Sequence, residues 1–401
     1  MRTLTIALVC ALCSWPLQAA VHHSSDFGWK AGQDVTEAFA QLFETGKLKA
    51  GDEFVLDQTY KISGHHELPD NFTLSAKKGA GFEVTDATPK APGPFLTLGD
   101  KNKLRNVTIT YLNTPPLGPT GEKHEVNFTR MTGIVADSKN DLLFENCRFV
   151  GSIGHHVRLR GQCNRPRFIG CHIAGGHWSV LISVKDAVFK RCVIEKCQGD
   201  GIKGGSDGLL VEDCVFQDNL RDGIDTTGGI NDAVIRNTIF RRLGTGGLDL
   251  KSFYGSEKEL ARPENVGIVI EDCRFVDIPN AIVLTTLDNG RRQGPGKELL
   301  NADNMAKYAP HDIDIKDCVF GHTDKPEYNR IHHEGGYRVD YPSKDGECMR
   351  AIFLKDAHSI RYHNARFFGD RIKVVQISSI GGSRHLSKEA AEAIEPTING
   401  T

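Results

Sequence analysis

The sequence has no excess of charge of either sign. It contains 49 lysines and arginines against 51 aspartates and glutamates, and no block of like charge stands out. This balance gives no argument for a nucleic-acid partner or for a charged tail. Beyond the first 20 residues no apolar run is long enough to cross a bilayer, so no membrane span is expected.

The short motifs of several enzyme classes are also missing. There is no H-E-x-x-H helix motif of the zinc proteases, no phosphate-binding glycine loop and no recognisable Ser/His/Asp pattern. Function must therefore be sought in patterns that repeat along the chain.

The first 20 residues have the form of a secretory signal. Arg2 precedes an apolar run over residues 4–15, which is followed by Pro16 and by small residues at Ala19 and Ala20. We expect this segment to be removed and the mature protein to be secreted or periplasmic.

The sequence does contain a repeat. The same unit is written three times, as G-D-G-I-K at 199–203, R-D-G-I-D at 221–225 and G-G-L-D-L-K at 246–251. Related units recur at intervals of about 22 residues from residue 144 to residue 238, and the later intervals are longer because they contain insertions. This period is too short for a pair of helices, and the leucine spacing of leucine-rich repeats is absent, but it suits a coil of three short strands. The sequence predicts an all-β fold, a right-handed parallel β-helix whose hand follows from the general preference of parallel crossovers.

Cysteine occupies one position of this repeat. Equivalent residues of stacked coils point the same way, so we interpret these cysteines as an inward column of small apolar side chains and not as disulfides. The pairing of Cys163, Cys197 and Cys348 is left open. The column contains Cys147, Cys171, Cys192, Cys214, Cys273 and Cys318, with Thr238 and Ala365 at equivalent positions.

The segments around the repeats suggest a cap and three insertions. Asp34 and Glu37 have capping-box spacing at the start of a helix predicted over residues 34–43, which would cover the open end of the solenoid, and a strand is predicted over 54–62. Loops on a rigid scaffold often carry binding surfaces. The predicted division is a signal at 1–20, an N-terminal cap at 21–70, the solenoid at 71–380 and a tail or second cap at 381–401, with insertions at 252–263, 287–310 and 321–346.

Two rows of residues are predicted to face outward from one strand column. Neighbouring residues of a strand point to opposite faces, so the residue after each inward apolar side chain must point out. The inward residues are Val157, Val180, Ile202, Ile224, Leu248, Ile282 and Ile352. The first outward row is Arg158, Leu181, Lys203, Asp225, Asp249, Val283 and Phe353, and the second is Arg160, Ser183, Gly205, Thr227, Lys251, Thr285 and Lys355.

Charged residues concentrate on this face, and we expect them to form one exposed, concave cluster. Several carboxylates within about 10 Å repel one another unless a cation joins them, and hard oxygen ligands at this density suit Ca²⁺. A lysine beside such a cation would have a lowered pKa, as a general base needs. Ordinary cross-strand pairs and Asp-Gly turns account for the same residues equally well.

The coil repeat, the capping helix and the signal resemble the pectate-lyase-like superfamily of right-handed parallel β-helix proteins. Within it, G-D-G-I at 199–202 and N-L-R-D-G-I-D at 219–225 are similar to the calcium-binding strands of family-nine pectate lyases. Those enzymes carry a catalytic lysine on the next coil, where Lys251 stands. The sequence departs from the pattern at Arg221, where family nine usually has aspartate, and at Asp249, which takes the strand position of the family's lysine.

The resemblance implies β-elimination on a uronic-acid-containing polysaccharide, pectate-like or alginate-like. Ca²⁺ and an arginine would neutralise the sugar carboxylate, and Lys251, or Lys203 in its place, would remove the adjacent proton. The residues selected by these roles are Arg158, Arg160, Lys203 and Lys251 for catalysis, Asp200, Asp222, Asp225 and Asp249 for calcium, and Trp178, Tyr254, Arg291 and Arg292 for substrate binding.

Other functions remain open on the same scaffold. A glycoside hydrolase or an epimerase would use paired carboxylates such as Asp222, Asp225 and Asp249 as acid and base. A non-catalytic β-helix would bind carbohydrate or a surface partner. In each case we expect a monomer, and the sequence decides neither the polymer nor the reaction.

Overall fold

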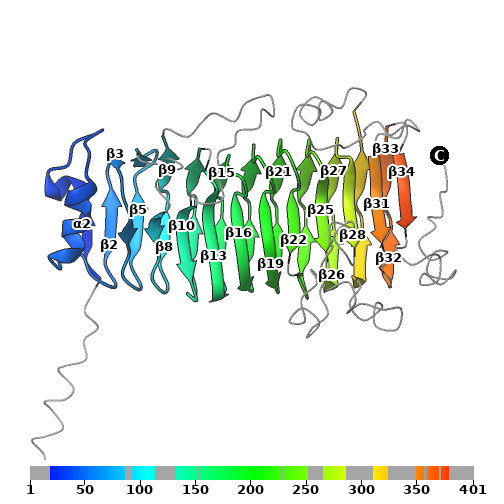
Figure 1. Cartoon of the computed structure of the whole chain (residues 1–401), viewed down its shortest axis with the longest axis horizontal. Coiled ribbons are helices and arrows are strands. Elements are labelled where there is room, and N and C mark those ends of the chain that lie inside the picture. The colour runs from blue at the N-terminus through cyan, green and yellow to red at the C-terminus, as the bar shows by residue number, and fades with distance from the viewer. Residues whose placement is uncertain are drawn as a thin grey trace, which may run out of the picture.

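The structure is a computed structural model that describes residues 19–85, 93–112, 132–151, 153–227, 229–251, 265–285, 310–323, 349–355, 357, 359–369 and 372–378. The chain winds into an elongated solenoid with three strands in most coils (Figure 1). The strands collect in three sheets, and every strand pairing within these sheets is parallel. The predicted parallel β-helix is confirmed. No helix in these ranges is long and apolar enough to cross a membrane.

The strands are named here by sheet. Sheet A contains β1 (Val21–His23), β2 (Glu53–Leu56), β5 (Thr73–Ala76), β8 (Lys103–Arg105), β11 (Leu143–Glu145), β14 (Arg167–Ile169), β17 (Val188–Lys190), β20 (Leu210–Glu212), β23 (Val234–Arg236), β26 (Val266–Glu271), β29 (His311–Lys316) and β32 (Ile360–His363). Sheet B contains β3 (Thr59–Ile62), β6 (Gly81–Val84), β9 (Thr108–Tyr111), β12 (Arg148–Val150), β15 (His172–Ala174), β18 (Val193–Glu195), β21 (Val215–Gln217), β24 (Ile239–Arg241), β27 (Arg274–Val276), β30 (Val319–Gly321) and β33 (Arg366–Phe368). Sheet C contains β4 (His66–Glu67), β7 (Pro94–Thr97), β10 (Thr132–Asp137), β13 (His155–Asn164), β16 (Val180–Lys185), β19 (Ile202–Asp207), β22 (Ile224–Thr227), β25 (Gly246–Lys251), β28 (Asn280–Thr285), β31 (Met349–Lys355) and β34 (Ile372–Ser378).

The corner between sheets A and B explains the cysteine repeat. From β8 onward two residues make each such corner, and the first has positive φ, for example 52° at Asn146 and 56° at Asp213. Asparagine and aspartate tolerate this left-handed conformation better than other non-glycine residues. The second residue points into the core, so Cys147 and Cys214 are each 1% exposed. All the predicted column cysteines are buried and free, as are Cys163 and Cys197, whereas Cys348 lies outside the described residues.

Aromatic rings stack along the core from coil to coil. Phe240 of β24 lies between Phe216 and Phe275, with ring centroids 5.0 Å away on each side. The stack continues through Phe320 to Phe367 at the last coil, where the exposed fraction rises to 36%. Each ring packs on the ring of the next coil. The strand register that sets the backbone hydrogen bonds therefore also aligns the core side chains.

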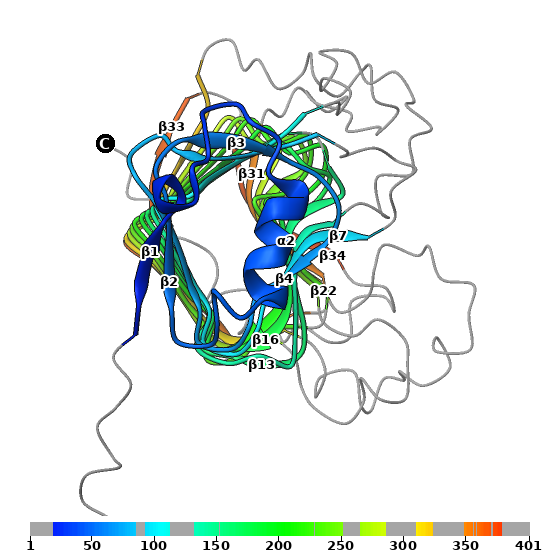
Figure 2. The same ribbon diagram turned by 90° about the vertical axis from the view of Figure 1, so that its left-hand side faces the viewer.

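A short helix closes the N-terminal end of the solenoid. Besides the 3₁₀ turn η1 (Ser24–Phe27), the described residues contain one α-helix, α2 (Thr36–Glu44), which crosses the open end of the core (Figure 2). Its Phe39 is fully buried, with its ring 5.5 Å from that of Phe82. The predicted cap helix is confirmed, but the predicted capping box is wrong. Asp34 accepts hydrogen bonds from the backbone and hydroxyl of Thr36, and the residue at the helix start is Val35.

The first coil also begins earlier than the sequence indicates. The strand expected over residues 54–62 is two strands, β2 and β3, which belong to different sheets and are separated by a turn at Asp57 and Gln58. Apolar alternation continues across that turn, so the pattern alone does not reveal the corner. Strands of all three sheets therefore lie within residues 21–70.

Removing one ring from the aromatic stack should destabilise the protein according to its burial. We expect Phe240→Ala to lower the free energy of unfolding by about 3–5 kcal/mol, because it leaves a cavity between two rings. Phe367→Ala is the matched control, since among the described residues that ring stacks on one neighbour and is partly exposed, and its cost should be well below that of Phe240→Ala. Chemical denaturation measures both costs, and equal losses would contradict the stacking order.

Candidate functional site

Sheet C brings the predicted outward row into one column. Arg158 pairs with Leu181, Leu181 with Lys203, Lys203 with Asp225, and Asp225 with Asp249. Neighbouring members lie one strand spacing apart, ~4.8 Å. The register therefore agrees with the alignment drawn from the repeat.

Six charged residues meet on β19, β22, β25 and the turns before β19 and β22. We call the following set the acid–lysine cluster. Its members are Asp200, Lys203, Asp222, Asp225, Asp249 and Lys251.

Glycines allow the coils to approach closely beside this cluster. A Cβ at Gly201 would lie 2.7 Å from the carbonyl oxygen of Gly223, and a Cβ at Gly223 equally close to that of Gly247. No side chain fits there, which explains why the repeat has glycine at this position. The close approach stacks Asp200 over Asp222 at the same point of successive coils, and the backbone N–H of Asp222 donates to Asp200 Oδ1 at 3.3 Å.

Both lysines bind the same carboxylate. Lys203 Nζ donates a hydrogen bond to Asp225 Oδ2, and Lys251 Nζ donates to the same oxygen at 3.0 Å. Each lysine has a second acidic neighbour, since Lys203 Nζ lies 3.4 Å from Asp200 Oδ2 and Lys251 Nζ 2.6 Å from Asp249 Oδ2. Asp225 is therefore the centre of the network.

The cluster is buried, so the prediction of an exposed face is wrong. Asp200 and Asp225 are fully buried, and Lys203 and Lys251 are 7% and 5% exposed. Strand alternation decides the direction in which a side chain points, but not how deeply neighbouring groups cover it. Among the side chains, that of Asp249 is the most accessible, at 16%. Asp249 and the two lysines thus form the outer layer, with the other three carboxylates beneath.

Burial and charge drive the carboxyl pKa values apart. Burial raises the pKa of Asp222 well above its usual range, and the nearby charges of Asp249, Asp200 and Asp225 raise it further. Burial also works to raise the pKa of Asp225, but Lys251 and Lys203 outweigh it and lower that pKa. The two neighbouring carboxyl groups therefore differ, since the pKa of Asp222 is raised and that of Asp225 is lowered.

The outer layer is held in a charged pair. Burial raises the pKa of Asp249 to about 6, against the opposing effect of Lys251. Burial alone would lower the pKa of Lys251, but Asp249, Asp225 and Asp222 raise it above its usual value. Burial alone would also lower the pKa of Lys203, but the charges of Asp200 and Asp225 raise it above its usual value. With no added cation both lysines are ammonium ions.

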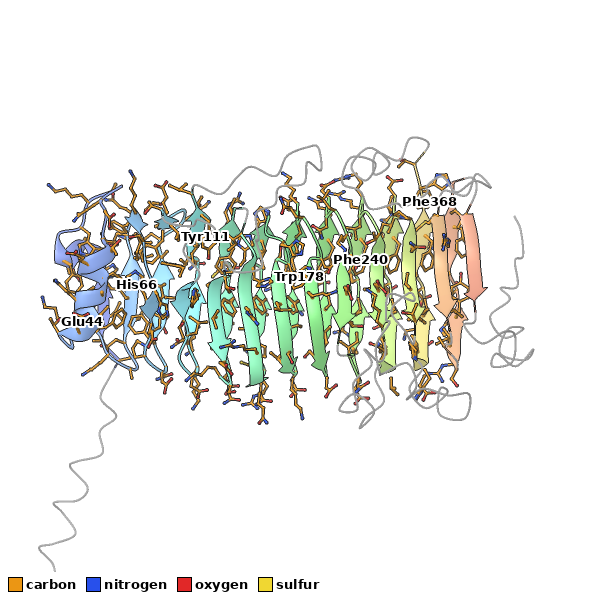
Figure 3. All side chains as sticks on the ribbon, viewed as in Figure 1. Glu44, His66, Tyr111, Trp178, Phe240 and Phe368 are labelled. Carbon is orange, nitrogen blue, oxygen red and sulfur yellow. The ribbon has the colours of Figure 1, made fainter. Side chains whose placement is uncertain are left out.

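Trp178 supports the cluster from the preceding coil. Lys203 Nζ lies over its ring, 5.7 Å from the centroid, and the ring of His155, from the coil before, stacks at 5.4 Å. The indole, labelled near the middle of the solenoid in Figure 3, is thus flanked by protein groups from the coils on both sides. This contact with the ammonium suits a role in holding Lys203 better than that of an open platform for a sugar.

The remaining predicted site residues separate into two groups. Arg160 continues the regular pairing of β13 with β10, where it lies opposite Asp137, and it is exposed and forms an ion pair with that residue at 2.8 Å. The cluster begins two coils later, at β19, so the structure does not bring Arg160 to it. Tyr254, Arg291 and Arg292, with the insertions that carry them, lie outside the described residues.

Two further side chains contact the cluster. Thr245 Oγ1 donates a hydrogen bond to Asp222 Oδ1 at 2.5 Å, and Arg221 Nε lies 3.8 Å from Asp200 Oδ1. Arg221 is already distinctive in the sequence, because it occupies the position where family-nine pectate lyases usually have aspartate. Nothing in the repeat distinguishes Thr245, whose role depends on the turn before β25.

Comparison with known proteins supports the fold. The family described as "Right handed beta helix region" matches residues 99–289. No curated protein matches the sequence significantly.

Similar solved structures have different activities. The Dettilon tailspike protein aligns over 89% of this chain and 68% of its own, at 13% identity and a TM-score of 0.56. A DFA-IIIase from Arthrobacter chlorophenolicus A6, in complex with DFA-III, aligns over 95% of this chain and 90% of its own, at 10% identity and 0.54. A polygalacturonase from Erwinia carotovora ssp. carotovora aligns over 90% and 97%, at 10% identity and 0.51. At such identities the likeness concerns the fold alone.

Removing the shared carboxylate should strongly destabilise the protein. We expect Asp225→Asn to lower the free energy of unfolding by about 3–5 kcal/mol, because it leaves two buried ammonium groups without their common partner. Asp141→Asn breaks the exposed pair with Arg165 and should cost about 1 kcal/mol or less. Denaturant unfolding at neutral pH compares the two, and a loss for Asp225→Asn as small as the control's would show that the network is not stabilising.

Proposed function

The chain has the right-handed parallel β-helix fold of the pectate-lyase-like superfamily, and we propose that it is an exported polysaccharide lyase. Its substrate would be a uronic-acid-containing polysaccharide, and its reaction β-elimination. The observation that carries the proposal is the pair of lysines, Lys203 and Lys251, that converge on Asp225 in the outer layer of the cluster. Two ammonium groups at the accessible edge of a largely buried site suit a polymer that carries a carboxylate on each sugar.

The elimination assigns a step to each group. A base removes the proton on the carbon beside the sugar carboxylate, the electron pair forms a carbon–carbon double bond, and the bond to the glycosidic oxygen breaks. Lys251, once it has lost its own proton, is the base, since it belongs to the outer layer beside Asp249. Lys203, held by Asp225 and Trp178, faces the sugar carboxylate as a cation. The departing oxygen takes up a proton from water.

Calcium suits the inner carboxylates. Oxygens of Asp200, Asp222 and Asp225 lie within 4.8 Å of one another, and Asp200 Oδ2 and Asp225 Oδ1 are buried without a hydrogen-bond partner. The ion pair of Asp200 Oδ2 with Lys203 does not have hydrogen-bond geometry. Orphaned carboxylate oxygens and a raised pKa at Asp222 are what a site for a hard cation would have. A bound Ca²⁺ would supply positive charge near the substrate carboxylate and reduce the negative field that keeps Lys251 protonated.

Glycoside hydrolysis fits these residues less well. It requires two carboxyl groups that both reach the glycosidic bond. Asp222 and Asp225 are 2% and 0% exposed, so Asp249 is the only accessible carboxylate of the cluster. An epimerase would share the proton abstraction by lysine, and its product separates it from a lyase.

The reaction is tested by incubating the protein with pectate, alginate and other uronate polymers. Lyase action gives unsaturated sugars that absorb ultraviolet light, hydrolysis gives reducing ends without that absorbance, and epimerisation gives neither. We expect Lys251→Ala to abolish the absorbance increase, whereas Lys190→Ala, which breaks a partly buried pair with Glu212 on sheet A, should retain it. Full activity in a variant lacking both Lys203 and Lys251 would refute the lyase mechanism.

Calcium binding is tested without reference to activity. Ca²⁺ at 100 times its dissociation constant should stabilise the folded protein by about 2.7 kcal/mol and raise its melting temperature. Asp222→Asn should reduce the shift, because it removes one charged ligand. Asp218→Asn, which changes a more exposed acid of the same coil that pairs with Arg242, should leave it intact. An identical shift in the two variants would place any calcium elsewhere.

A further inference from the structure

Arg158 of β13 has no partner of its own in the described part of the chain. Its Nε is buried and makes no hydrogen bond, and none of the described carboxylates lies in ion-pair contact with it. Arg160, two residues later, is already paired with Asp137. A guanidinium that is partly removed from water and lacks an acidic partner is costly, and a ligand carboxylate would offset that cost.

The direct neighbours of Arg158 in its column are uncharged. The next member of its column is Leu181, which is apolar. Burial, aided by the charge of Arg158, lowers the pKa of His155 to about 4, so this neighbour is neutral at physiological pH. Arg158 therefore lies in its column between two uncharged neighbours, Val135 and Leu181, and the nearby Asp137 is already paired with Arg160.

The strand register excludes Arg158 from the reacting centre. Lys203 lies two coils further along the solenoid, about 10 Å away, and Lys251 lies on the coil of Asp249, about 19 Å from Arg158. A single sugar carboxylate cannot contact Arg158 and sit beside Lys251. The expected role of Arg158, neutralising the reacting sugar, does not fit this separation.

We propose that Arg158 forms a separate subsite that binds the carboxylate of a second uronate residue in the same polysaccharide chain. This inference rests on the proposed function. A 1→4-linked uronate chain advances by roughly one strand spacing per sugar, so a chain lying along the solenoid axis brings a later carboxylate to Arg158. The planar guanidinium binds a carboxylate through two parallel hydrogen bonds. The subsite thus selects oligomers long enough to extend from the cluster to β13.

The test measures binding, so that it does not depend on turnover. A length series of oligogalacturonates and of alginate oligosaccharides is titrated calorimetrically into the Lys251→Ala protein, with and without Arg158→Gln. Arg158→Gln should weaken binding of the longer oligomers about 10- to 100-fold, as expected for charge-assisted hydrogen bonds, and leave the shortest unchanged. Arg160→Gln, on the same strand, is the matched control and should change neither.

Two further measurements test whether binding at Arg158 needs the carboxylate of the oligomer and the geometry of the guanidinium. Carboxyl-reduced oligomers should bind equally to the proteins with and without Arg158→Gln. Arg158→Lys, which keeps the charge but loses the two-point geometry, should give an intermediate loss, with circular dichroism confirming that each variant is folded.

The outcomes separate this inference from the lyase proposal. Length-dependent loss in Arg158→Gln with no unsaturated product from the wild-type protein supports the subsite and refutes the lyase. Unsaturated product together with unchanged length dependence in Arg158→Gln overturns the subsite and leaves the lyase standing. A uniform loss at every length, or no binding of any oligomer, also overturns the subsite.

Discussion

The structure depends on the register between successive coils. Each coil is hydrogen-bonded to the next through three parallel sheets, and the strand pairing continues from β10 to β34 in sheet C with a register shift between β13 and β16. Because the register is kept, each position of the repeat becomes a column along the solenoid, whether it is a phenylalanine in the core, a cysteine at a corner or an acid on the surface. A register slip of one residue would move every such column to the opposite face of its sheet.

The same constraint concentrates charge on sheet C. Stacking places Asp200 over Asp222 and Asp225 beside Asp249, at spacings where carboxylates repel each other. The two lysines offset part of that repulsion, and what remains raises the pKa of Asp222. Such a network is costly to bury and stabilises less than an apolar core of equal volume. The chain nevertheless retains it at the centre of the solenoid, which is easier to understand for a site than for a purely structural contact.

The charge of the outward-facing side chains changes along sheet C. The register of β13 against β16 shifts after Leu159, Arg160 pairs with Asp137 of the preceding coil, and Arg158 is left in the column without an acidic partner. The face therefore changes along the axis from a lone cation, past the apolar Leu181 and Trp178, to the mixed cluster. Such a gradient suits an extended acidic ligand better than a small one.

The sequence alone determined the fold and the columns. A fixed repeat with apolar residues at alternate positions permits one strand register, so the inward column of Val157, Ile202 and Leu248 and the alignment of Lys203 with Asp225 could be predicted. Only the tertiary structure decided depth, partners and irregularities. Asp225 is buried and binds both lysines because groups from different coils meet there. The register shift after Leu159 and the hydrogen bond from Thr245 likewise depend on contacts between coils. Their physical reason is that pKa, burial and ion pairing are properties of a three-dimensional neighbourhood, whereas periodicity specifies only the direction in which each side chain leaves the strand.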